Sequence, residues 1–181
     1  MKSFTTPKGP SGFSNLFVAD TKFNPDGQYK TSITLTAEQA APLVEAVEEE
    51  RLELGKKAKT SKGSPFKENE DGTLTFTFKS KKKPRVVDSK GNAVRDEPRV
   101  GGGSTIQVKG AFATYEGFGG GVCAYLNEVR LIKLVEGGGG WGSDDDEEEE
   151  GYVADPSAPA PKSPAPAGAE QEEPVEEDIP F

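Results

Sequence analysis

The amino-acid sequence predicts a mainly β domain, built as a small, partly open barrel of about five strands with one inserted α-helix. Apolar and polar residues alternate over several stretches, as they do in strands with one buried face, whereas a single stretch has helical spacing. The chain then changes to an acidic composition rich in Pro, Ala and Gly, which predicts a disordered tail.

Two strands and the helix are predicted in the first third of the chain. Residues 16–19 form a short apolar run, and residues 29–35 alternate between apolar and polar side chains. The Asn-Pro-Asp-Gly sequence at residues 24–27 favours a turn between them. Thr36 stands three residues before Gln39, which is the spacing of a capping box, so a helix is expected to begin there. Its apolar stripe, which we expect to pack on the sheet rather than bind a partner, consists of Leu43, Val44, Val47 and Leu54.

The remaining strands follow a Lys-rich loop at residues 56–64. Residues 73–79 place Leu and two Phe on one face and two Thr and a Lys on the other, which makes them the clearest strand. Residues 85–88 and the turn at residues 89–92 indicate a hairpin. Two long β-type runs are expected at residues 105–115 and 122–134, joined by a glycine-rich loop at residues 116–121.

The composition excludes several classes of chemistry. The chain has no His, which removes the base of a Ser or Cys triad and the commonest transition-metal ligand. Its one Cys, Cys123, has neither a disulfide partner nor clustered ligands for a zinc or iron–sulfur site. There is no signal-peptide core and no run of roughly 18 apolar residues. We therefore expect a soluble, cytoplasmic protein that is not an enzyme and needs no metal or cofactor.

Charge divides the chain into two predicted parts. Residues 1–136 carry 21 Lys and Arg against 17 Asp and Glu, whereas residues 137–181 carry one Lys and 14 acids. The first part is therefore +4 and the second −13, and only the first has enough apolar residues for a core. A basic body is expected to meet a polyanion, and the acidic tail to meet either a second partner or the body itself.

A basic cluster and two aromatic residues are the strongest indication of function in the body. The cluster follows the strand at residues 73–79 and comprises Lys79, Lys81, Lys82, Lys83 and Arg85, while Tyr115 and Phe118 lie at the glycine-rich loop. Cations neutralise phosphates, and exposed rings stack on unpaired bases with about 1 to 3 kcal/mol per base. The residues predicted to contact single-stranded nucleic acid are Lys30, Lys81, Lys82, Lys83, Arg85, Lys109, Tyr115 and Phe118.

Other interpretations of these residues stay open. The lysines can form a solvated turn, and the two rings can fold back into the core. Phe118 is the better candidate for an exposed ring, because the glycines on both sides of it offer no packing framework. Three further aromatic residues are expected in the interior because they lie within alternating strands, namely Phe76, Phe78 and Phe112.

The last four residues form a second candidate site. Asp178, Ile179, Pro180 and Phe181 place an apolar group after an acidic stretch that is otherwise nearly free of large apolar residues. Phe181 can fill a small pocket in a partner, its carboxylate can pair with a cation, and the acids before it can steer toward a basic surface.

Five short segments carry a resemblance to a known family. They are Asn-Glu-Asp-Gly-Thr-Leu-Thr-Phe-Thr-Phe-Lys at residues 69–79, Val-Val-Asp-Ser-Lys-Gly at 86–91, Gly-Gly-Gly-Ser at 101–104, Thr-Tyr at 114–115 and Gly-Tyr-Val-Ala at 151–154. In these segments the chain resembles the single-stranded DNA-binding proteins of T7-like bacteriophages, over most of residues 65–154. The resemblance implies an OB-fold, dimerisation, strand annealing and an acidic tail that contacts the replicative polymerase and the helicase-primase.

The chain departs from that family at its tip. Asp178, Ile179, Pro180 and Phe181 are similar to the tip of bacterial single-stranded DNA-binding proteins, whereas the T7 tail ends in Phe without the Ile-Pro. A host protein that recognises bacterial tails is therefore a candidate partner.

These features together predict a sequence-independent single-stranded DNA-binding protein of phage DNA replication and recombination. It would protect and anneal single strands and recruit replication proteins through its tail. The alternative is an acidic protein-interaction factor, such as a DNA mimic or an assembly chaperone, in which the tail is the active surface. The basic cluster and the apolar tip argue against this alternative.

Overall fold

The computed structural model describes residues 1–22, 25–54, 63–135 and 153, apart from the side chain of Phe118. Except for Val153, the predicted disordered tail and its tip lie outside the described residues, as does most of the Lys-rich loop. The elements in chain order are β1 (Lys2–Thr5), β2 (Gly9–Pro10), β3 (Asn15–Asp20), β4 (Gln28–Leu35), α1 (Ala37–Glu53), β5 (Phe66–Glu68), β6 (Leu74–Ser80), β7 (Arg85–Val87), β8 (Thr105–Tyr115) and β9 (Gly121–Lys133).

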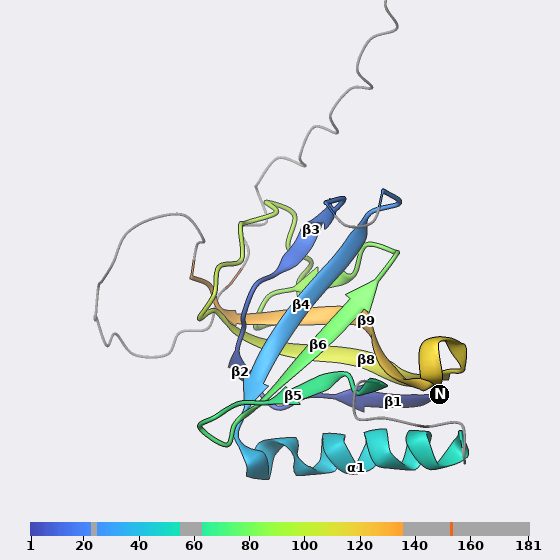
Figure 1. The fold of residues 1–181 in the computed structure, drawn as a ribbon. Helices are drawn as coiled ribbons and strands as arrows, with labels where there is room; N and C mark the ends of the chain where they lie inside the picture. The colour runs from blue at the N-terminus through green and yellow to red at the C-terminus, as the bar shows by residue number, and fades with distance from the viewer. Residues whose placement is uncertain (23–24, 55–62, 136–152, 154–181) are drawn as a thin grey trace, which may run out of the picture.

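The strands form one sheet that curls into a barrel, with the order β1-β8-β9-β6-β4-β3 (Figure 1). β2 pairs with β8, and Ser11, just after β2, forms an antiparallel bridge to Ile33 in β4. The N-terminal segment therefore contacts strands from both halves of the sheet, and this closes the ring. β6 and β9 meet through one parallel pair, Lys79 and Tyr125, so the barrel is only partly closed there.

The core fills the barrel with the inward side chains of the alternating strands. Phe76, Phe78 and Phe112 are fully buried, which confirms their predicted interior position. Phe4 of β1 packs against two of them, with its ring centroid 4.3 Å from that of Phe112 and 5.4 Å from that of Phe78. These rings tie β1, β6 and β8 together and hold the opposite, outward side chains of the same strands in place.

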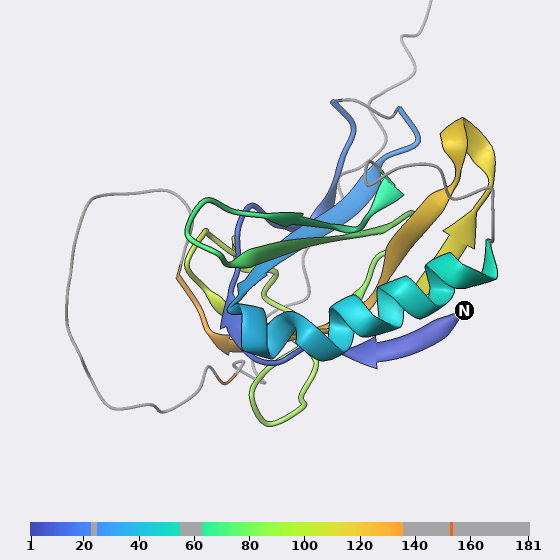
Figure 2. The ribbon, with the colours of Figure 1, turned by 60° about the horizontal axis from the view of Figure 1, so that its bottom comes forward.

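The helix α1 covers one end of the barrel, where it contacts β1, β4, β8 and β9 (Figure 2). The predicted capping box is present, because the Thr36 side chain accepts a hydrogen bond from the Gln39 backbone and the Gln39 side chain accepts one from the Thr36 backbone. Leu43 and Val47 of the predicted stripe are buried, and Val44 is partly buried. The expectation that this stripe packs on the sheet is confirmed for these three residues, whereas Leu54 is the C-cap residue after the helix and is not part of the core cluster.

The five principal strands predicted from the sequence are present, and the described residues form four further short strands, β1, β2, β5 and β7. The strands at residues 16–19, 29–35, 73–79, 105–115 and 122–134 are confirmed within one or two residues as β3, β4, β6, β8 and β9. The unpredicted strands β1, β2 and β5 are short and lack clear alternation, and β2 contains a Pro. They are extended because they form hydrogen bonds with neighbouring strands, β1 and β2 with β8 and β5 with β6, and not because of a pattern in their own sequences.

The predicted hairpin at residues 85–92 is confirmed in its turn but not as a simple two-stranded unit. The carboxylate of Asp88 accepts hydrogen bonds from the backbone of Lys90 and Asn92, which fixes the turn, and Val87 bridges back to Ala93. The strand β7 itself pairs in parallel with β9. This pairing brings the basic cluster of the sequence next to a strand that lies about 40 residues further along the chain.

Candidate nucleic-acid interface

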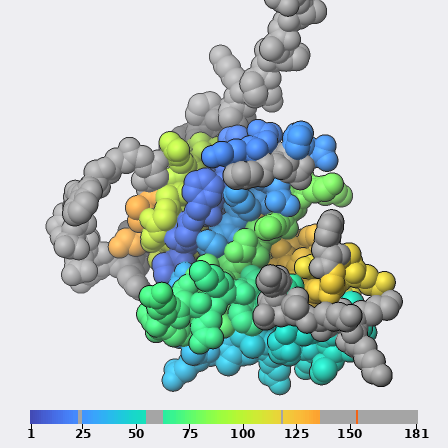
Figure 3. All heavy atoms as spheres, viewed as in Figure 1, coloured from blue at the N-terminus to red at the C-terminus, as the bar shows by residue number. Residues whose placement is uncertain are grey.

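A row of polar and aromatic side chains crosses the outer face of the sheet. Lys30 of β4 lies opposite Lys79 of β6, and Lys79 lies opposite Tyr125 of β9. Because alternate residues point to opposite faces of a strand, the buried neighbours Thr31, Phe78 and Leu126 place these three side chains outward. Figure 3 shows this face, with β3 and β4 in blue, β5 and β6 in green, and β8 and β9 in yellow to orange next to one another.

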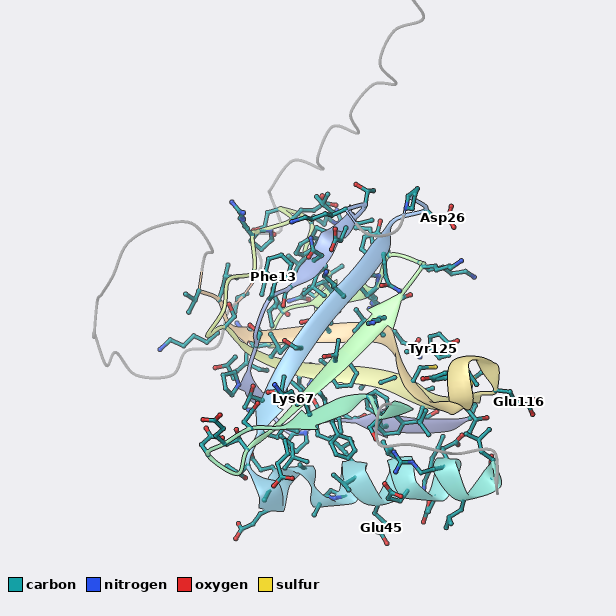
Figure 4. All side chains as sticks on the ribbon, viewed as in Figure 1. Phe13, Asp26, Glu45, Lys67, Glu116 and Tyr125 are labelled. Carbon is teal, nitrogen blue, oxygen red and sulfur yellow. The ribbon has the colours of Figure 1, made fainter. Side chains whose placement is uncertain are left out.

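An open groove of about 690 Å³ adjoins this row, between β5, β6 and the ends of β8 and β9. Tyr115 and Tyr125 line it with exposed fractions of 39% and 46%, and Lys67 and Lys79 add two ammonium groups. β5 and β9 both pair with the edge of β6 that faces away from β4, so Lys67 and Tyr125, which Figure 4 labels, lie along the same edge of β6. The polar part of the lining comes from Asn69, Thr75 and Thr77. Exposed rings, cations and hydroxyl groups together suit a ligand with flat bases and phosphates.

Tyr125 keeps its phenol group neutral at physiological pH. The pKa of Tyr125 is raised above its usual value of 10.0. The main cause is a hydrogen bond with Cys123, and a smaller cause is the charge interaction with the same residue. The Cys123 thiol itself donates to the carbonyl oxygen of Ala113, at 3.3 Å. Tyr125, which lines the groove, therefore adds no negative charge that would repel a phosphate.

Most of the cations predicted to contact nucleic acid are paired with an acid in the described structure. Lys81 Nζ lies 3.9 Å from Asp26 Oδ2, and the Arg85 and Lys109 side chains each lie 3.6 Å from Glu128. Lys30 pairs with Asp20 and Lys83 with Glu97. These pairs are partly or largely exposed, and such pairs contribute only about 0 to 1 kcal/mol, so a phosphate can replace the acid at modest cost.

The pair between Lys30 and Asp20 persists across the neutral pH range. Hydrogen bonds from Lys30 Nζ and from the backbone N–H of Lys22 lower the pKa of Asp20 below its usual value of 3.8. A lowered pKa means that the favourable contribution of the pair is complete above about pH 4 and is lost only as the pH falls through the lowered pKa. Protonation of Asp20 therefore does not break its pair with Lys30 near neutral pH.

Two curated phage proteins are similar in sequence to this chain. The single-stranded DNA-binding protein of Escherichia phage T7 is 37% identical over 115 residues, a match that spans 54% of this chain and 50% of the T7 protein. The single-stranded DNA-binding protein of Enterobacteria phage T3 is 33% identical over 173 residues, spanning 74% of this chain and 75% of the T3 protein. The chain belongs to this phage family. No family model matches the chain.

Solved structures of phage single-stranded DNA-binding proteins share the fold. The crystal structure of T7 gp2.5 matches with a TM-score of 0.60 and 27% identity, over 82% of this chain and 99% of that one. The protein of bacteriophage Enc34 in complex with ssDNA matches with a TM-score of 0.60 and 13% identity, over 74% of this chain and 88% of that one. The match to gp2.5 confirms the predicted OB-fold, and the family is one of DNA-binding proteins without enzymatic activity.

The fold of this family member brings some of the predicted residues together and leaves others apart. Lys30 lies in the row and Tyr115 in the groove, whereas Arg85 and Lys109 meet at Glu128. Lys83 lies outside the groove, with its Nζ 5.8 Å from the centroid of the Phe17 ring. Lys81 and Lys82 follow β6 and are exposed. The side chain of Phe118 and the residues Asp178, Ile179, Pro180 and Phe181 lie outside the described part of the chain.

Sequence reasoning did not select Lys67 and Tyr125, and it included Lys79 only as a member of the basic cluster. Strand alternation carried a signal for Tyr125, because Ala124 and Leu126 on both sides of it are apolar. The pairing of Tyr125 with Lys79 joins strands more than 40 residues apart and has no local signal in the sequence.

Two features are absent from the described residues. These residues contain no group of three or more His, Cys, Asp or Glu side chains that could hold a metal ion. No helix among them is long and apolar enough to cross a membrane.

Proposed function

We propose that the protein binds single-stranded DNA without sequence preference along the row and the groove. The observation that carries the proposal is the cross-strand neighbourhood of the exposed Tyr125 ring and the Lys79 ammonium group. A ring can stack on any base, and a cation beside it can neutralise the adjoining phosphate. The T7 and T3 relatives are single-stranded DNA-binding proteins, which supports the same ligand.

The proposed contacts extend beyond the row. Lys67, Lys79 and Tyr125 are assigned because of their place in the groove, in addition to the residues selected from the sequence. Those residues are Lys30, Lys81, Lys82, Lys83, Arg85, Lys109, Tyr115 and Phe118. The cations bind phosphates and the three rings Tyr115, Phe118 and Tyr125 stack on bases, so affinity comes from a salt-dependent and a salt-independent part.

A salt titration tests this function. Binding of a twelve-nucleotide oligothymidine and of a duplex of the same length is measured by fluorescence anisotropy at several salt concentrations. For single strands the slope of log K against log salt is about −0.7 for each phosphate neutralised, so four contacts give roughly −3. We expect that slope or a steeper one, and binding of the single strand at least about tenfold tighter than that of the duplex. Equal affinity for both would contradict stacking, and binding only to basic proteins would support the DNA mimic instead.

The biological setting is proposed from the family. The protein acts in phage DNA replication and recombination in the host cytoplasm, where it protects and anneals single strands, and it forms a homodimer. Its acidic tail recruits replication proteins, with the replicative polymerase and the helicase-primase as candidates. The similarity of Asp178, Ile179, Pro180 and Phe181 to bacterial tips adds host proteins that recognise such tails.

Deleting residues 137–181 is expected to tighten binding to oligothymidine at low salt. The tail carries a net charge of −13 and the body +4, so the tail competes with DNA for the same cations until it is displaced. The gain should vanish as salt screens both interactions. Full-length and shortened proteins are compared by anisotropy between about 0.02 and 0.5 M salt.

A control for chain length keeps the tail but replaces the seven consecutive acids at residues 144–150 by Asn and Gln. This variant should reproduce part of the gain, because charge and not the mere presence of the tail causes the competition. Unchanged or weaker affinity in both variants would show that the tail does not compete with DNA.

A further inference from the structure

Phe13 is an exposed aromatic residue that the groove does not use. Its side chain is 70% exposed, and it lies in the segment between β2 and β3. The Nζ atom of Lys30 lies 5.6 Å from the centroid of its ring. Exposing a large apolar side chain to water is energetically unfavourable, so such a ring on the surface often marks a contact with a ligand. Because a cation lies beside this ring, the ligand that fits is partly apolar and anionic.

The row across the sheet connects Phe13 with the groove. Lys30, whose ammonium group lies near the Phe13 ring, is opposite Asn15 on one side and opposite Lys79 on the other. Lys79 in turn is opposite Tyr125. Neighbouring strands are about 4.8 Å apart, so β9 and β3 are separated by roughly 14 Å across the sheet. In Figure 4, Phe13 lies on one side of β4 and Tyr125 on the opposite side of β6.

The surface beyond Phe13 has room for a base and a cation for a phosphate. Phe13 borders an open hollow of about 530 Å³ between β3 and residues 97–102. Phe17 adds a second, partly buried ring to its wall, and the exposed Arg99 adds a guanidinium group. The chemistry of the groove is therefore repeated at the other end of the row, with a ring, a neighbouring cation and open space.

We propose that Phe13 is a second stacking site for the same DNA strand, which crosses the sheet from Tyr125 over Lys79 and Lys30 to Phe13. The proposal rests on the proposed binding of single-stranded DNA and adds the direction and the extent of the DNA path. Stacked nucleotides advance about 3.4 Å each, so the path of roughly 14 Å takes about four nucleotides, and fewer if the strand is extended. Lys30 exchanges Asp20 for a phosphate within this path.

Photocrosslinking tests the position of the strand. Full-length protein is irradiated with a twelve-nucleotide oligothymidine in which single positions carry 5-iodouracil, and crosslinked peptides are identified by mass spectrometry. We expect crosslinks at Tyr125 and, from positions about four nucleotides away, at Phe13. Crosslinks at Tyr125 without any at Phe13 would overturn the inference and leave the proposed function standing. Absence of any DNA binding by the unsubstituted protein would overturn both.

Affinity measurements on variants supply a second readout. Phe13→Ala is expected to weaken binding of the oligonucleotide by roughly 5- to 100-fold, with the loss persisting at high salt. Phe13→Leu keeps the apolar character without a ring and should lose as much, whereas Phe13→Trp should retain the affinity. Leu52→Ala is the matched control, because Leu52 is an apolar residue that is 78% exposed on α1, lines neither the groove nor the hollow and has no ring, and it should leave the affinity unchanged. Unchanged affinity in Phe13→Ala, or full affinity in Phe13→Leu, would overturn the inference.

Discussion

Replacing Tyr125 by alanine is expected to weaken binding of a twelve-nucleotide oligothymidine by roughly 5- to 100-fold. The ring is 46% exposed in the groove and lies opposite Lys79, so it offers a face to a base whose phosphate the lysine neutralises. Stacking releases no counterions, and the loss should therefore be similar at low and high salt. Anisotropy titrations at two salt concentrations measure it.

Two comparisons separate stacking from other roles of Tyr125. Tyr125→Phe keeps the ring and loses only the hydroxyl group and its hydrogen bond with Cys123, so it should bind nearly as well as the unsubstituted protein. Lys79→Ala should instead give a loss that disappears at high salt, because it removes a phosphate contact. An equal loss in Tyr125→Phe, or a loss in Tyr125→Ala that salt abolishes, would rule out the stacking role.

Replacing Gly110 by alanine is expected to lower the free energy of unfolding by about 3 kcal/mol. A Cβ atom at this position would lie 1.9 Å from the backbone oxygen of Tyr125 and 2.8 Å from Cζ of Phe4. The first contact is with backbone, so the strands β8 and β9 have to separate at the irregularity next to Gly110. Because Tyr125 moves with β9, DNA binding should fall together with stability.

Urea unfolding and DNA titrations on the same preparation measure both effects. Gly102→Ala is the matched control, since a Cβ atom there comes no closer than 4.0 Å to its nearest neighbour, and its stability should stay within about 0.5 kcal/mol. If Gly110→Ala were as stable as Gly102→Ala, β8 and β9 could not be packed as closely at Tyr125 as the structure indicates.

Local patterns in the chain are sufficient to predict its general architecture. Alternation identified the long strands β4, β6, β8 and β9, because each has one buried face. The spacing of Thr36 and Gln39 located the start of α1, because a capping box acts within one helical turn. Family segments such as residues 69–79 supported the OB-fold, which the structural match to gp2.5 confirms.

The binding surface, in contrast, depends on contacts between distant parts of the chain. Lys30, Lys79 and Tyr125 come from three strands and become neighbours only through the β4–β6 and β6–β9 pairings. The acids that pair with Arg85 and Lys109, and with Lys83, are likewise distant in sequence. Alternation tells which side chains point outward, but the register between strands is set by packing of the shared core, and it therefore appears only when the chain is folded.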